Sequence, residues 1–400
     1  MSNTSSESRM PQDSVDWALV QSVEELLPLL RENAAEAERL RRLPPANLKA
    51  LESLGITQLT VPKRYGGLQV NLATEFEVVR TIARVCGSTS WVTALYAVCG
   101  YWASLFPDSV QDEVFSGPQA RVAGVAAPGG KLVPTDGGYL LTGKWPWNTG
   151  VLDATWNVLS AVLPREDGTK EPYMALVPTA EMKILDDWHM SAMQGTGSNS
   201  SMAQDVFVPA ERALPFAQLL GGDHVSEANR GITEYSYAVF PFLLAASAGT
   251  PIGMAQGALE SFLARAPKRT TSFENADPQS TSPVAQFQVG EISMAIEAAL
   301  AISRGAIASL HLHAIQGTPV STEERVRVRA AVAYATRLSA DATTALSRIG
   351  GATAFRLDIV GQRHQRDAAM LSNHAHFNYE THLGLLGSVV MGNEPRAMLL

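Results

Sequence analysis

The chain has few cysteines, few aromatic residues and no excess of positive charge. Its 400 residues include 2 cysteines, and aromatic residues make up 7%. Cys86 and Cys99 form no CxxC pair, so the sequence indicates neither a disulfide framework nor a zinc site. The formal net charge is -8, which provides no basic surface of the kind that nucleic acid attracts. We therefore expect no nucleic-acid partner.

Uninterrupted hydrophobic runs are also scarce. The longest apolar stretch, residues 235–255, is broken by two prolines and two glycines, and we expect it to fall short of a membrane span. Residues 1–14, MSNTSSESRMPQDS, are polar and lack the apolar segment of a signal peptide. The sequence thus predicts a disordered leader over 1–14, no membrane partner and a cytoplasmic protein.

Several catalytic and binding motifs are missing. No G-x-S-x-G motif occurs, so no activated serine is indicated. Residues 195–200, GTGSNS, resemble a dinucleotide fingerprint only in part, because Ser200 replaces the third glycine and a strand is expected to follow. His374, Asn378 and His382 have helical spacing but no carboxylate in register with them. We therefore expect no metal.

The composition fits a well-buried globular protein, with 46% hydrophobic and 18% charged residues. Periodicity and turn residues predict N-terminal helices over 15–42, 45–54, 74–84 and 89–105. Short apolar runs between Gly, Pro and Asp turns then indicate a β insert, and helices return near residue 225. We place three domains: N-terminal helical 15–119, middle β 120–222 and C-terminal helical 223–400.

Two long helices are expected in the last domain. One spans 290–313, where apolar residues recur at helical spacing. Ser321 and Glu324 form a capping box that opens the second, which Gly350 and Gly351 end. The polar segment 268–283 is expected to be a mobile surface loop.

The segment GKWPWNTG, residues 143–150, is the first candidate for binding chemistry. Trp145 and Trp147 flank one turn and could form a flat apolar wall for a ring system, with Asn148 and Thr149 offering hydrogen bonds at its edge. Taken alone, the segment fits a plain β-turn over a tryptophan core better.

The order of helices, β insert and helices, together with these motifs, resembles the acyl-CoA dehydrogenase superfamily from about residue 20 onward. The resemblance implies a mainly α fold with a β insert: an N-terminal helical domain, a middle β-barrel or sandwich domain, and a C-terminal four-helix bundle that assembles homotetramers. It also implies that GKWPWNTG forms the flavin wall, with Thr149 near the reactive nitrogen of the flavin and Trp145, Trp147 and Asn148 beside it.

Two further segments resemble cofactor-binding parts of the same superfamily. Residues 187–209 are similar to its second flavin segment, which implies that Gly195, Thr196 and Ser198 cradle the flavin tail. RIGGA at 348–352 and the later arginine resemble the residues that receive the cofactor phosphates with a neighbouring subunit, which implies roles for Gly350, Gly351 and Arg366.

His374 is the candidate that separates two chemistries. The position matched to the catalytic glutamate of the dehydrogenases carries Ala375, and His374 precedes it. A lone histidine is more often structural, but an imidazole in this register suits proton transfer or hydrogen bonding around an oxygenated flavin. We expect Asn378, one helical turn later, to support His374, and His376 to face elsewhere on the same helix.

The resemblance therefore implies the oxygenase component of a two-component flavin-dependent monooxygenase. Such an enzyme uses reduced flavin, FMN or FAD, and O2 through a flavin hydroperoxide to hydroxylate a small aromatic or phenolic substrate. The chain has no nicotinamide-binding motif, so a separate NAD(P)H:flavin reductase is the expected partner. Gly130 and Lys131 stand where the dehydrogenases have a Ser-Asp pair that helps to hold CoA, which argues against a CoA substrate.

The type of reaction and the role of His374 stay open at this stage. N-hydroxylation of an amino sugar, oxidation of a heterocycle, and an acyl-CoA dehydrogenase or oxidase reaction remain alternatives. His374 could act as a base or as a hydrogen-bond partner of the peroxide. The aromatic candidates for the substrate pocket are Tyr101, Trp102, Phe240, Phe242 and Phe377.

Overall fold

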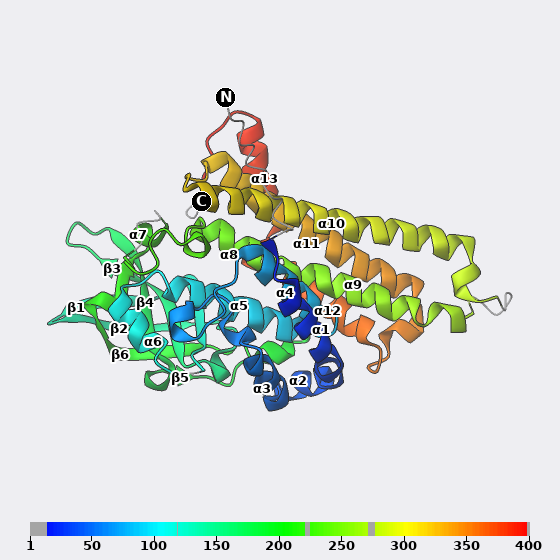
Figure 1. Ribbon diagram of the computed structural model, residues 1–400, viewed down its shortest axis with the longest axis horizontal. Helices are drawn as coiled ribbons and strands as arrows, with labels where there is room; N and C mark the ends of the chain where they lie inside the picture. The colour runs from blue at the N-terminus through cyan, green and yellow to red at the C-terminus, as the bar shows by residue number, and fades with distance from the viewer. Residues whose placement is uncertain (1–13, 118, 221–224, 271–276, 398–400) are drawn as a thin grey trace, which may run out of the picture.

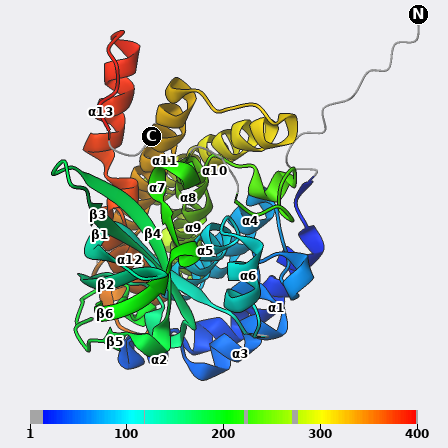
Figure 2. The same ribbon diagram turned by 90° about the vertical axis from the view of Figure 1, so that its left-hand side faces the viewer.

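A computed structural model describes residues 14–117, 119–220, 225–270 and 277–397. The predicted leader lies outside this part of the chain except for Ser14. Figure 1 shows the strands gathered at one end of the molecule and the long helices of the last domain running along its longest axis toward the other end. The first helices of the chain, within residues 17–53, lie together on one side of the molecule (Figures 1 and 2).

The first domain is helical, as predicted. Its helices are α1 Trp17–Glu32, α2 Ala34–Leu40, α3 Pro45–Ser53, α4 Leu72–Ala83, α5 Gly87–Ala103 and α6 Asp108–Val114. The single helix expected over 15–42 is two helices separated at Asn33, whose side-chain amide donates a hydrogen bond to Asn47 Oδ1 at 2.8 Å. Every residue of α5 is buried, so this helix forms the centre of the molecule.

The middle domain is one seven-stranded sheet in the order β5-β6-β2-β1-β3-β4-β7. Its strands are β1 Val122–Thr135, β2 Gly138–Trp145, β3 Trp156–Pro164, β4 Lys170–Pro178, β5 Lys183–Ile184, β6 Ser201–Pro209 and β7 Ala213–Pro215. Among the strands of the described residues, β1 and β3 pair in parallel and the other neighbours pair antiparallel. The short helix α7, Phe216–Leu220, follows the last strand, close to the predicted domain boundary.

The last domain is helical and consists of α8 Val239–Ser247, α9 Gly249–Leu263, α10 Pro283–Gln316, α11 Thr322–Ile349, α12 Val360–Leu371 and α13 Tyr379–Val390. The capping box is confirmed: Ser321 Oγ accepts from Glu324 N at 3.3 Å, and Glu324 Oε2 accepts from Ser321 N at 3.0 Å. The helix α10 begins earlier than predicted because Ser282 caps it and Pro283 suits its first turn. Residues 271–276 of the predicted loop lie outside the described part.

Within the described residues, the helical segments 239–268 and 283–316 have the length and hydropathy of a membrane span. The expected interruption of 235–255 is present, because α8 ends at Ser247 and α9 begins at Gly249. The most apolar part of the first segment is 94% buried within the protein. Its glycines allow close packing, because a Cβ on Gly253 would lie 2.1 Å from the carbonyl oxygen of Arg80 on α4. The apolar residues of this segment form core.

Candidate active site

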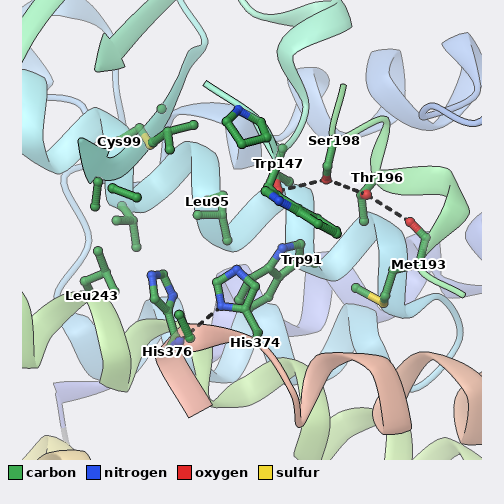
Figure 3. A pocket seen from close by; sticks show the side chains of 18 of the residues that line it. Trp91, Leu95, Cys99, Trp147, Met193, Thr196, Ser198, Leu243, His374 and His376 are labelled. Atoms are coloured by element: carbon green, nitrogen blue, oxygen red, sulfur yellow. Dashed lines mark hydrogen bonds between the residues drawn. The ribbon is translucent and has the colours of Figure 1, made fainter. Parts of the chain in front are cut away.

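A cavity of about 680 Å³ lies between the middle domain and the helices. Its walls come from α5, the first half of β1, the segment after β2, the loop before β6, the helix α8 and the turn between α12 and α13. Figure 3 shows side chains from these elements pointing toward one another across the cavity. Segments far apart in the sequence thus meet at one site.

One side of the cavity carries three buried hydroxyl groups that are bonded in series. Thr149 Oγ1 lies 3.0 Å from Ser198 Oγ, which lies 2.7 Å from Thr196 Oγ1. Thr196 Oγ1 in turn donates to the carbonyl oxygen of Met193 at 2.9 Å (Figure 3). We call Thr149, Thr196 and Ser198 the hydroxyl wall. The structure brings together these three residues, which the sequence had indicated in two separate segments.

A carboxylate on α12 holds the loop that carries most of the hydroxyl wall. Met193 has a positive φ of 50°, which is uncommon for a residue other than glycine. Its backbone N–H donates to Asp367 Oδ1 at 2.6 Å. Asp367 is 1% exposed, and burial raises the pKa of its carboxyl to about 6. Asp367 therefore links the loop to the last domain.

The two tryptophans of GKWPWNTG have different environments. Trp145 is fully buried in the core of the middle domain, and its indole N–H donates to the carbonyl oxygen of Ser160 at 2.7 Å. The prediction that Trp145 forms the ring wall is therefore wrong, because its place in β2 turns it into the sheet core. Trp147 has a φ of 64°, is 54% exposed and lines the cavity. Its ring packs edge-on against Trp188, with centroids 5.4 Å apart.

Asn148 and Gly195 support the site from outside the cavity lining. The side-chain amide of Asn148 donates to Asn157 Oδ1 and to Ser201 Oγ, so this residue joins the end of β2 to β3 and β6. A Cβ on Gly195 would lie 2.9 Å from Ala37 Cβ, which places Gly195 against α2. Both residues therefore shape the local fold instead of presenting a group to a ligand in this cavity.

The opposite side of the cavity carries two imidazoles on a turn. The helix α12 ends at Leu371, His374 has extended backbone angles, and a single 3-10 turn over Ala375–Phe377 precedes α13. His374 and His376 both line the cavity with ring centroids 4.5 Å apart (Figure 3). We call these two residues the imidazole wall. The prediction of one helix with His376 facing elsewhere is wrong, because the break in the helix brings His376 back toward the cavity.

Asn378 has a role other than the predicted one. Its side-chain oxygen accepts from the backbone N–H of Thr381 at 2.9 Å, which caps the first turn of α13. The amide is therefore used by the backbone and does not support His374. Its helix-capping role follows from the same helix break that moved His376.

Burial determines the protonation of the imidazole wall. It lowers the pKa of His374 to about 4 and holds the pKa of His376 well below its usual value. The backbone N–H of His376 donates to His374 Nδ1 at 3.2 Å. Because Nδ1 accepts this bond, the neutral ring of His374 carries its proton on Nε2. His374 therefore offers an N–H donor at neutral pH.

The predicted substrate aromatics divide into two groups. Trp102 and Phe240 line the cavity. Tyr101, Phe242 and Phe377 belong to the core: Tyr101 donates to the carbonyl oxygen of Tyr237 at 2.9 Å and stacks on Phe242 at 4.1 Å, and Phe377 packs against Trp91 at 5.7 Å. The prediction for these three is wrong, because each is held by core contacts.

Sequence reasoning missed the part of α5 that forms the cavity floor. Trp91, Leu95 and Cys99 line the cavity from this helix, and Trp91 packs edge-on against His374 with centroids 5.2 Å apart (Figure 3). Residues 87–103 have buried side chains around the whole helix. A pattern of this kind indicates a central helix, but it does not show which face of the helix meets a cavity.

The remaining predicted cofactor residues lie outside this cavity. Gly351 lines a second hollow of about 380 Å³ together with Arg269 and Arg348, near the start of α10 and the end of α11. Gly350 precedes it and caps α11. Arg366 donates hydrogen bonds to Glu38, to the carbonyl oxygen of Ser191 and to Gln362. Within one chain these residues and the hydroxyl wall do not form a single site.

In the described residues, no group of three or more His, Cys, Asp or Glu side chains is arranged to hold a metal ion.

The family description "Acyl-CoA dehydrogenase, N-terminal domain" matches residues 17–107, and "Acyl-CoA dehydrogenase, C-terminal domain" matches residues 245–379. The fold and the site therefore define a protein of the acyl-CoA dehydrogenase superfamily, and the predicted fold class is confirmed.

Three relatives place the chain within this superfamily. It is 33% identical over 366 residues to a pigment production hydroxylase of Rhodococcus sp. (strain ATCC 21145), covering 91% of this chain and 93% of the relative. It is 31% identical over 384 residues to the oxygenase subunit HsaA, a flavin-dependent monooxygenase of Mycobacterium tuberculosis, covering 94% and 96%. The structure of XiaF from Streptomyces sp. in complex with FADH2 and glycerol superposes with a TM-score of 0.91 at 30% identity, covering 96% and 97%.

The chain belongs to the oxygenase components of flavin-dependent monooxygenases with the acyl-CoA dehydrogenase fold. The prediction of an oxygenase in place of a dehydrogenase is thereby confirmed.

Proposed function

We propose that this protein hydroxylates a small, uncharged aromatic substrate, with phenols as the leading class, using reduced flavin and O2. The observation that carries this proposal is the pairing of the hydroxyl wall with the imidazole wall across a largely apolar cavity. The hydroxyl wall suits the polar edge of a flat cofactor, and the imidazole wall can act on a substrate held between the cofactor and the histidines.

The residues present fit a flavin ring. The exposed ring of Trp147 offers an apolar face, and the hydroxyls of Thr149 and Ser198 offer hydrogen bonds beside it. XiaF, which shares the fold, was solved with FADH2. When bound, the reduced cofactor would supply the two electrons that activate O2, and O2 would supply the oxygen atom that is transferred, with its second atom leaving as water. The protein's part is to hold the ring, exclude water and position the substrate.

The role of His374 follows from its tautomer. With Nδ1 occupied by the His376 backbone, Nε2–H is the group that can donate to an oxygen in the cavity. We infer that His374 donates a hydrogen bond from Nε2 to the substrate hydroxyl or to the oxygen being transferred. Acting as a base at Nε2 would first require the other tautomer and the loss of the bond to His376.

Charge at the cavity favours an uncharged substrate. Among the described lining residues, Lys144 is the one with a permanent charge, and its ammonium lies 3.7 Å from the carboxylate of Asp187. A carboxylated substrate would therefore meet no free cation in the cavity. Likewise no carboxylate lines it in the described part of the chain, and Glu380 is exposed on α13. An acyl-CoA dehydrogenase reaction would lack its base here, whereas N-hydroxylation or oxidation of a heterocycle could use the same walls.

The second hollow supports a role for a neighbouring copy of the chain. Arg269 and Arg348 line it with Gly351, and two guanidinium groups beside a glycine suit phosphate oxygens. Exposed apolar side chains on α10, namely Val284, Phe287, Met294, Leu312 and Ile315, offer a surface for subunit contact. We propose a homotetramer in which this hollow receives the flavin phosphates of a neighbouring subunit. We also propose that the protein is cytoplasmic and that a separate NAD(P)H:flavin reductase is its partner.

The test is a reconstitution with photoreduced FMN or FAD, air and matched aromatic pairs such as 4-ethylphenol and 4-hydroxyphenylacetate. We expect hydroxylated product from the neutral member and mainly hydrogen peroxide from the carboxylated one, measured by chromatography and a peroxidase assay. Preference for the carboxylated member would contradict the uncharged-substrate proposal. Oxidation of an acyl-CoA without any reductase would overturn the proposed function.

A further inference from the structure

A buried arginine and histidine lie behind the imidazole wall, outside the cavity lining. Arg329 on α11 is 7% exposed and His382 on α13 is 2% exposed. Arg329 Nε donates to His382 Nδ1 at 3.1 Å. The guanidinium carbon of Arg329 also lies 5.1 Å from the ring centre of Phe240, which lines the cavity. Burying a cation is costly, so its position between two parts of the active site calls for an explanation.

The bond from Arg329 determines how His382 faces the imidazole wall. Because Nδ1 accepts from the guanidinium, the neutral ring of His382 carries its proton on Nε2. The pKa of His382 is lowered to about 4, mainly by burial and to a smaller extent by the charge of Arg329, whereas the backbone of Ala375 and of His376 raises it. His382 Nε2 is buried and makes no hydrogen bond with the described residues, so Arg329 is the group that fixes the orientation of the ring.

A connected series of contacts therefore runs from α11 to the cavity. Arg329 orients His382 in the first turn of α13, which begins just after the turn over Ala375–Phe377, and α11 itself packs against that turn. The same turn provides the His376 N–H that donates to His374 Nδ1. That last bond is the one that leaves Nε2–H of His374 available to the cavity.

We propose that Arg329 and His382 are positioning residues for the oxygenation, which hold the turn over 374–376 so that His374 presents Nε2–H to the cavity. This inference rests on the proposed function. Neither residue touches the cavity lining at His374 directly, so both act through the turn. Removing a residue that orients an active-site group from behind commonly lowers activity by about tenfold or more.

The first measurement needs neither flavin nor substrate. Long-range ¹H–¹⁵N NMR of the ¹⁵N-histidine-labelled protein reports which ring nitrogen of each histidine carries the proton, with assignment by His374→Ala and His376→Ala. We expect the Nε2–H form for His374 in the natural protein and a mixture of tautomers in Arg329→Met and His382→Leu. An unchanged Nε2–H signal in folded Arg329→Met would overturn the proposal.

The second measurement compares product with hydrogen peroxide during flavin oxidation. We expect about a tenfold lower fraction of product in Arg329→Met and His382→Leu, with flavin affinity within about twofold of the natural protein. His382→Asn, which keeps an acceptor for Arg329 near the place of Nδ1, should restore part of the loss. Equal losses in His382→Asn and His382→Leu would point to packing alone and would contradict the positioning role.

Arg327→Met is the matched control on the same helix, because Arg327 pairs with Glu323 at the surface and its side chain is 56% exposed. It should leave both measurements unchanged. If Arg329→Met does not fold, Arg329→Lys keeps the charge while losing Nε and answers the same question. Absence of product in the natural protein would refute the proposed function, whereas the NMR result would still decide whether the pair controls the tautomer of His374.

Discussion

The two walls of the cavity differ in how fully their hydrogen-bonding groups are used. The hydroxyl wall forms a continuous series of bonds that ends on the carbonyl of Met193. On the imidazole wall, His376 Nδ1 is buried without a hydrogen-bond partner and both rings are kept neutral by burial. This difference supports the roles that we propose, in which the hydroxyl wall holds the cofactor and the imidazole wall acts on the reacting groups.

The largest effect is expected when one ring of the imidazole wall is removed. His374→Ala should lower the yield of hydroxylated product by about 100-fold, because a positioned donor or acid contributes at least this much. Flavin affinity should stay within about twofold, since the hydroxyl wall is intact. Product and peroxide yields, with flavin binding by fluorescence, check this; His313→Ala on the outer part of α10 is the control. Unchanged turnover would remove His374 from the mechanism.

A smaller effect is expected from releasing the loop that carries the hydroxyl wall. Asp367→Ala removes the acceptor of the Met193 N–H, and we expect about tenfold weaker flavin binding together with a loss of stability of about 1–3 kcal/mol. Asp367→Asn keeps a carbonyl acceptor and should recover most of the affinity. Isothermal calorimetry and chemical unfolding measure the two effects. A destabilised Asp367→Ala protein with normal flavin affinity would separate this loop from cofactor binding.

Removing one member of the hydroxyl wall should have a milder effect. Thr149→Val deletes one hydroxyl while keeping the shape, and we expect flavin affinity to fall about fivefold, the size of one net hydrogen bond. Thr149→Ser should restore binding. The measurement is flavin titration by fluorescence, and an equal fall in the serine variant would mean that the methyl group matters more than the hydroxyl.

The smallest effect concerns stability against pH. Because the folded pKa of His374 is about 4 and its ordinary value is 6.5, its contribution is present above pH 6.5 and is lost as the pH falls toward 4. For this partly exposed ring we expect a contribution of about 1 kcal/mol between pH 7 and 5. His374→Phe should flatten the pH dependence of unfolding by this amount, whereas Thr149→Val should leave the slope unchanged. Urea unfolding at both pH values tests the difference, and parallel slopes for the natural protein and His374→Phe would argue against a neutral ring at His374.

Three residues of the cavity could be predicted from short segments. Thr149, Thr196 and Ser198 were identified because their segments resemble the flavin segments of the superfamily, and the structure places them in one cavity. Trp145 and Trp147 could not be separated in the same way, because a single positive φ at Trp147 decides which of the two rings leaves the sheet. Tyr101 and Phe242 failed as pocket residues for a related reason: aromatic character gives no information on which side of a core a ring lies.

By itself, the sequence determined the order of helices, β insert and helices, the two ends of α11 and the chemical types of the groups near the site, because periodicity, capping and turn residues act between near neighbours along the chain. Only the tertiary structure decided that His376 joins His374 at the cavity, that Asn378 serves α13, and that α5 forms the floor. These outcomes depend on where α12 stops and on contacts between residues hundreds of positions apart, so no local pattern contains them.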